Sequence, residues 1–76
     1  MKGFLLNIHG DWFVRQEFGV NQVKNYPLND KCIQGADEFG IEGEEVHFEV
    51  KGMFAPRTLN GIIQSAVIIY NSDGKN

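Results

Sequence analysis

Apolar and polar side chains alternate with a period of two residues through most of this chain. The alternation is clearest over residues 45–51, where Val46, Phe48 and Val50 are separated by polar side chains. A β-strand places successive side chains on opposite faces of a sheet, whereas a helix repeats about every 3.6 residues. We therefore predict an all-β (mainly β) fold in which these three apolar side chains point inward.

The same rhythm predicts five strands, at residues 2–9, 12–18, 23–28, 45–51 and 61–70. The pair Gly10-Asp11 is suited to a tight hairpin turn with glycine at a positive φ, and residues 19–22 predict a second turn. Pro27 has no amide donor, so we expect it at the end of a strand or on an edge strand.

The remaining segments are predicted as connections. Residues 29–43 contain three glycines and no alternation, so we expect a loop with at most one short helical turn after Asp30, for which the pair Asn29-Asp30 offers an N-cap. Residues 52–60, which include Pro56, are predicted to form the loop before the last strand. Residues 71–76 are expected to be a flexible tail beyond a single domain of residues 1–70.

Five short strands in a chain of 76 residues are expected to close on themselves, because an open sheet would expose one face and two edges. We predict a small five-stranded barrel or strongly curled antiparallel sheet, OB-like or SH3-like. The insert between the third and fourth strands favours the OB-like form, in which a helix often occupies that position. A curled sheet that dimerises is the alternative.

Composition excludes several classes of protein. Apolar residues make up 42% of the chain and aromatic residues 12%, which is typical of a folded domain. No apolar run approaches the ~20 residues that span a bilayer, and the N-terminal residues lack the features of a signal peptide. Cys32 is the only cysteine, so no internal disulfide forms, and a cytoplasmic location is expected.

Charge is distributed unevenly along the chain. Six acids lie between Asp37 and Glu49 with no lysine or arginine among them, and the rest of the chain carries seven bases and four acids. A solvated acidic segment keeps a small protein soluble. It also suits a surface that binds a basic protein partner.

The segment of residues 43–50 resembles the fourth-strand segment of cold-shock domains, which are OB barrels. That family also has two aromatic, glycine-rich strands on which bases stack. Here the nearest segment is Trp12-Phe13-Val14, and Lys2-Gly3-Phe4 is shorter than the family's Lys-Gly-Phe-Gly-Phe run. We therefore transfer none of the family's nucleic-acid residues to this chain and assign it to no family.

The leading functional hypothesis is a small non-catalytic protein-interaction module of bacterial or phage accessory type. A homodimer is one form that this module could take. Aromatic rings in polar loops are typical anchors for a protein partner. Phe54 is the first candidate for an exposed ring and Phe39 the second. Their neighbours Met53, Arg57 and Glu42 complete this candidate set.

Single-stranded nucleic-acid binding on an OB-type barrel is the alternative. Its candidate residues are Phe13 and Arg15, which share one face of their strand, and the residues of the loop between the fourth and fifth strands, Lys51, Met53, Phe54 and Arg57. The net charge of −3 disfavours this hypothesis, because phosphate binding needs clustered lysine and arginine.

A small enzyme with its site between subunits is the third hypothesis. Cys32 with His9 or His47 could in principle form a nucleophile and a base, but their spacing does not require contact. The acids after Asp37 do not follow the alternate positions of a calcium-binding loop. No catalytic residue, metal or cofactor is therefore assigned, and the chain is expected not to be an enzyme.

Replacement of an inward side chain tests the predicted alternation. Val46→Asp is expected to abolish the cooperative thermal transition measured by circular dichroism, because it places a charge on the buried face of its strand. A variant that melts like the parent chain would contradict the assigned face.

Overall fold

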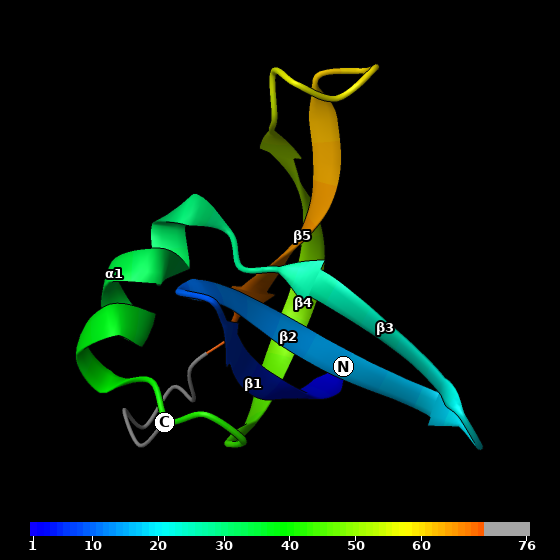
Figure 1. Cartoon of the computed structure of the whole chain (residues 1–76), viewed down its shortest axis with the longest axis vertical. Coiled ribbons are helices and arrows are strands. Elements are labelled where there is room, and N and C mark those ends of the chain that lie inside the picture. Colours follow the sequence, from blue (N-terminus) through cyan, green and yellow to red (C-terminus); the bar gives the residue numbers. More distant parts are fainter. Residues whose placement is uncertain (70–76) are drawn as a thin grey trace.

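The computed structural model describes residues 1–69 and consists of five strands and one helix (Figure 1). The expected end of the last strand at Tyr70 and the expected tail 71–76 lie outside the described residues. In chain order the elements are β1 (Lys2–Ile8), β2 (Asp11–Gly19), β3 (Gln22–Pro27), α1 (Asp30–Phe39), β4 (Glu45–Phe54) and β5 (Ile62–Ile68).

The strands form a nearly closed antiparallel barrel. Their order is β3-β2-β1-β4-β5, so β1 is central and pairs with both β2 and β4. The two end strands approach each other at one place, where Leu28 forms a parallel bridge with Ala66. With a helix between β3 and β4, this connectivity is OB-like, one of the two topologies predicted from the sequence.

The core lies inside the barrel. Leu5, Val14 and Tyr26 are aligned across β1, β2 and β3, and all three are buried. Phe48 on β4 is fully buried and its ring centroid is 5.7 Å from that of Tyr26. Val46 and Val50 pack against this core while their polar neighbours on β4 are exposed, which confirms the predicted inward face.

Both predicted hairpin turns are present, with one correction. The first turn is formed by His9 and Gly10, because Asp11 already pairs with Ile8. Both turn residues have positive φ, 53° and 89°, the conformation that matches the twist of a two-residue hairpin. Pro27 ends the edge strand β3, as predicted.

The helix is longer than the single turn expected. It has ten residues, and Cys32 and Ala36, one helical turn apart, are its buried side chains. Glycine lowers helix propensity, so Gly35 made this segment resemble a loop. Packing of one helical face against the barrel outweighs that cost, and Gly40 follows the last helical residue.

Strand β4 is also longer than expected, so the prediction of a loop over residues 52–60 was wrong at its start. Gly52, Met53 and Phe54 belong to β4 and pair with residues 62–64 of β5. The glycine and the nearby proline indicated a loop, but pairing with a β-branched partner strand extends the hairpin. The true loop covers residues 55–61.

Asn29 joins four elements at the point where the barrel closes. Its backbone N–H donates to the Ala66 carbonyl (2.8 Å), and its Oδ1 accepts from the Lys31 N–H (3.1 Å), which caps α1. Its Nδ2 donates to Ser65 Oγ (2.8 Å), and that hydroxyl donates to the Lys51 carbonyl of β4 (2.9 Å). Asn29 and Ser65 are both buried, so these bonds satisfy polar groups that water does not reach.

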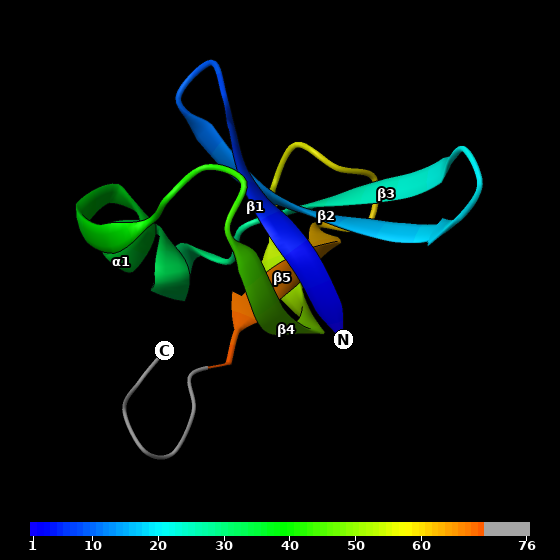
Figure 2. The same cartoon turned by 90° about the horizontal axis from the view of Figure 1, so that it is seen from below.

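Beyond this junction the β2–β3 and β4–β5 hairpins point in different directions, while α1 lies at another side of the barrel (Figures 1 and 2). Trp12 Nε1 donates to Asp37 Oδ1 (2.9 Å) and so links β2 to the helix. Within residues 1–69, the ends of both hairpins and the last turn of the helix carry exposed rings, Phe18, Phe54 and Phe39.

Removal of the Asn29 side chain tests this junction. Asn29→Ala is expected to lower the free energy of unfolding by about 2–4 kcal/mol, because it removes a helix cap and leaves Ser65 without its donor. Chemical denaturation measures the change. Asn25→Ala, an exposed position on β3, is the control and should change the free energy by less than about 0.5 kcal/mol. Equal effects of the two changes would contradict the role given to Asn29.

Candidate interaction surfaces

The seven binding residues predicted from the sequence fall at three separate places on the barrel. Phe39 and Glu42 lie where α1 leads into β4. Met53, Phe54 and Arg57 lie at the far end of the β4–β5 hairpin, and Phe13 and Arg15 lie on the outer side of β2. The structure therefore does not combine them in one site.

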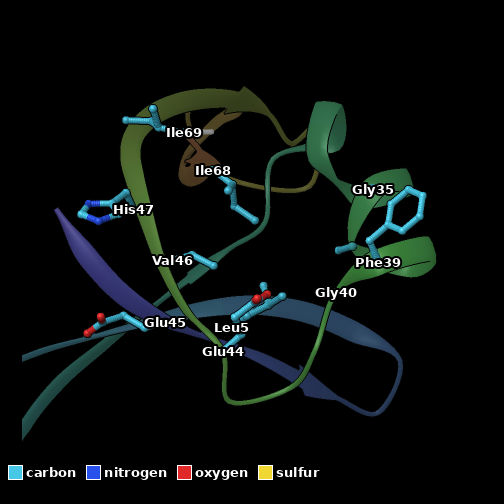
Figure 3. A pocket seen from close by; sticks show the side chains of 11 residues that line it. Leu5, Gly35, Phe39, Gly40, Glu44, Glu45, Val46, His47, Ile68 and Ile69 are labelled. Atoms are coloured by element: carbon cyan, nitrogen blue, oxygen red, sulfur yellow. The ribbon is translucent and has the colours of Figure 1, made fainter. Parts of the chain in front are cut away.

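The first place is a cavity of about 210 Å³ between α1 and the strands β4 and β5. Its apolar lining side chains are Leu5, Ala36, Phe39, Val46, Ile68 and Ile69. In Figure 3, Val46 and Ile68 extend from the strands and Phe39 stands on the helix across from them. Phe39 is 79% exposed, so this ring borders the opening rather than filling the core.

Acidic residues lie beside the same cavity, and the carboxylate of Glu45 points away from it in Figure 3. Glu44 and Glu45 belong to its lining, and Glu42 lies two residues earlier in the chain. All three are exposed. Within residues 1–69 the only ion pair is that of Lys51 with Glu49 (Nζ to Oε2, 3.9 Å), so these three carboxylates have no cationic partner there. We call the cavity, with Glu42, Glu44 and Glu45, the acid-rimmed pocket.

The second place is the end of the β4–β5 hairpin, which we call the hairpin tip and define by Phe54, Leu59 and Ile62. Phe54 and Ile62 are directly paired, and they are 73% and 58% exposed. Leu59, in the loop, is fully exposed. Three large apolar side chains so exposed at one end of a hairpin are typical of a contact surface.

The loop of the hairpin tip is held by its own hydrogen bonds. Ala55 N–H donates to the Gly61 carbonyl (2.8 Å), and the Thr58 amide and hydroxyl both donate to the Ala55 carbonyl (3.0 and 2.8 Å). Gly61 has a φ of +71°, which favours glycine there. The tip therefore presents its apolar side chains from an ordered loop.

The third place is the outer face of β1 and β2. Phe13 pairs with Leu6, and Arg15 pairs with Phe4, so these four side chains lie on the side of the sheet opposite Val14. All four are half-buried, and within residues 1–69 none of the apolar three packs against the core. The Nε of Arg15 is buried and has no hydrogen-bond acceptor in the described part of the chain.

The Cys–His hypothesis gains no support from the arrangement. Cys32 is buried in α1, whereas His47 is exposed on β4. His47 lines the acid-rimmed pocket and Cys32 does not. Over residues 1–69, no three His, Cys, Asp or Glu side chains are grouped so that they could hold a metal ion.

Leu59, Ile62 and the two isoleucines of the pocket were not identified from the sequence. Ile62 could have been found, because it follows a turn glycine at the start of a strand and faces a predicted exposed ring. The pocket could not, because it depends on the position of a helix that was expected to be a loop.

Comparisons of the chain with protein-family models, curated proteins and solved structures find no match. Among the described residues, no helix has the length and apolar character needed to cross a membrane. The function is therefore inferred from the three surfaces of the barrel described above.

Replacement of phenylalanine by alanine at one exposed and one buried position distinguishes the hairpin tip from the core. Phe54→Ala is expected to leave the thermal midpoint within about 3 °C of the parent chain, because the ring is mostly exposed. Phe48→Ala, at a fully buried ring, is expected to lower the free energy of unfolding by about 3–5 kcal/mol. Circular dichroism during heating measures both. Loss of the transition in Phe54→Ala would place that ring in the core.

Proposed function

We propose that this chain is a small cytoplasmic protein-interaction module that holds a basic, apolar segment of a protein partner in the acid-rimmed pocket. The observation that carries the proposal is the combination of an apolar cavity and unpaired carboxylates at its border. Apolar contact supplies affinity, and charge complementarity selects the partner and speeds association.

The size of the cavity suits one large apolar side chain. A protein cavity of about 150 Å³ is large enough for a benzene molecule. At about 210 Å³, the pocket has room for one phenyl or leucyl side chain of a partner. Phe39 belongs to the lining, and its exposed ring at the end of the helix is available to a partner that enters the pocket.

The charges restrict the partner to a basic segment. Glu42, Glu44 and Glu45 lie within four residues, and the nearest bases in the sequence, Lys31 and Lys51, lie outside this segment. A partner with acids beside its apolar anchor would meet like charges, which is unfavourable at an interface.

A synthetic peptide tests the proposal directly. We expect a fluorescent peptide with a central phenylalanine flanked by lysines to bind in an anisotropy titration, and a matched peptide with glutamates in place of the lysines not to bind. Binding should weaken as salt is added, because part of it is electrostatic. Phe39→Ala and the double change Glu44→Lys with Glu45→Lys should each raise the dissociation constant by about tenfold or more.

Phe18→Ala is the matched control, because Phe18 is an exposed ring at the end of the other hairpin. It should bind the peptide as the parent chain does. Equal binding of the basic and acidic peptides, or equal losses in Phe18→Ala and Phe39→Ala, would refute the proposed site.

A second candidate, binding of single-stranded nucleic acid, is favoured by one observation. Arg15 is half-buried beside Phe4 and Phe13, and its Nε has no acceptor within residues 1–69, so we infer that the exposed part of the guanidinium contacts a phosphate while bases stack on the rings. A labelled oligothymidylate in the same titration decides between the candidates. Binding that Arg15→Gln removes and the pocket variants keep would favour nucleic acid.

A further inference from the structure

We infer that the segment held in the acid-rimmed pocket is the hairpin tip of a second copy of this chain, so that copies associate head to tail. The inference rests on the proposed function of the pocket and names its partner. The tip has the two properties that the pocket requires, exposed apolar side chains and positive charge.

The chemistry of the tip complements that of the pocket. Phe54, Leu59 and Ile62 are the apolar contacts, and Phe54 is a ring of the size that the cavity admits. Arg57 is the only charged residue of the loop 55–61, and Lys51, further along β4, is paired with Glu49. Arg57 lies in the loop of the tip, where it would face the carboxylates of the pocket.

The two surfaces cannot meet within one molecule. The pocket is lined by the first residues of β4, and Phe54 is the last residue of the same strand. Nine residue steps at about 3.3 Å separate them by about 30 Å along a strand. A contact between tip and pocket therefore joins two copies.

The order of the tip favours such a contact. Its loop is closed by hydrogen bonds from Ala55, Thr58 and Gly61, so little conformational freedom is lost when it docks. Because one contact joins two different surfaces, a docked pair still has one free tip and one free pocket. The pair either closes into a two-fold dimer, when these two surfaces also meet, or adds further copies as rings or open chains.

Sedimentation velocity over a range of protein concentrations tests the inference. The mass of the parent chain is expected to rise with concentration, to the dimer when the contacts are reciprocal and past it when they are not. Phe54→Ala, which damages the tip, and Glu44→Lys with Glu45→Lys, which damages the pocket, should each remain monomeric. Each should raise the dissociation constant of self-association by about tenfold or more.

An equimolar mixture of these two variants gives the sharpest outcome. One variant retains an intact pocket and the other an intact tip, so the mixture should form heterodimers and stop there. Phe18→Ala, away from both surfaces, should associate as the parent chain does.

A parent chain that stays monomeric at all concentrations would overturn the inference, and so would a mixture that stays monomeric. In either case, binding of the basic peptide to the pocket would still support the proposed function. Conversely, self-association that persists in the pocket variant would show that copies meet elsewhere.

Discussion

The buried side chain of Asn29 is the constraint on which the barrel depends. It lies where β3 ends, α1 begins and β5 passes, and its hydrogen bonds reach β4 through Ser65. Apart from the Leu28–Ala66 bridge, β3 and β5 are not paired with each other. This bridge and the Asn29 junction therefore hold the two strands together, in place of the ladder of backbone hydrogen bonds of a fully closed barrel. A buried amide is costly without partners, which makes the junction specific as well as stable.

Closure at one junction explains why so much apolar surface remains outside. The core is small, with Leu5, Val14, Tyr26, Leu28 and Phe48 as its large members. Both hairpins continue beyond the region that this core can cover, and their ends retain exposed rings. A chain of this length cannot bury every large side chain inside one barrel. The surfaces that we assign to partners are therefore the parts of the hairpins and the helix that extend past the core.

The alternation of side chains was sufficient to predict the strands, because burial on one face of a sheet leaves a direct record in the sequence. Val46, Phe48 and Val50 illustrate this, and residue type alone indicated an N-cap at the pair Asn29-Asp30, of which Asn29 is the cap. The lengths of the helix and of β4 were underestimated, because Gly35 and Gly52 have low local propensity for a helix and a strand. Their neighbours nevertheless hold these elements together, by packing in the helix and by pairing with distant residues in the strand. Local preference predicts an element only where tertiary contacts do not oppose it.

The candidate site was less predictable than the fold. Exposed rings at positions 39 and 54 could be expected from polar neighbours, and both are exposed. Their separation could not, because it depends on the length of β4 and on where α1 docks. The association of acids with an apolar cavity is likewise a product of the three-dimensional arrangement, in which Ile68 and Ile69 approach the helix from the other end of the chain.

Residues of β4 contribute to both proposed partner surfaces, and this restricts insertions and deletions in the strand. Side chains on β4 alternate between its two faces, so an inserted or deleted residue near Val50 would reverse the faces of everything on one side of the change. Either Val46 or Phe54 would then point the wrong way relative to the other. Point substitutions can alter the two proposed surfaces separately, whereas a change in the length of this strand reverses one of them relative to the other.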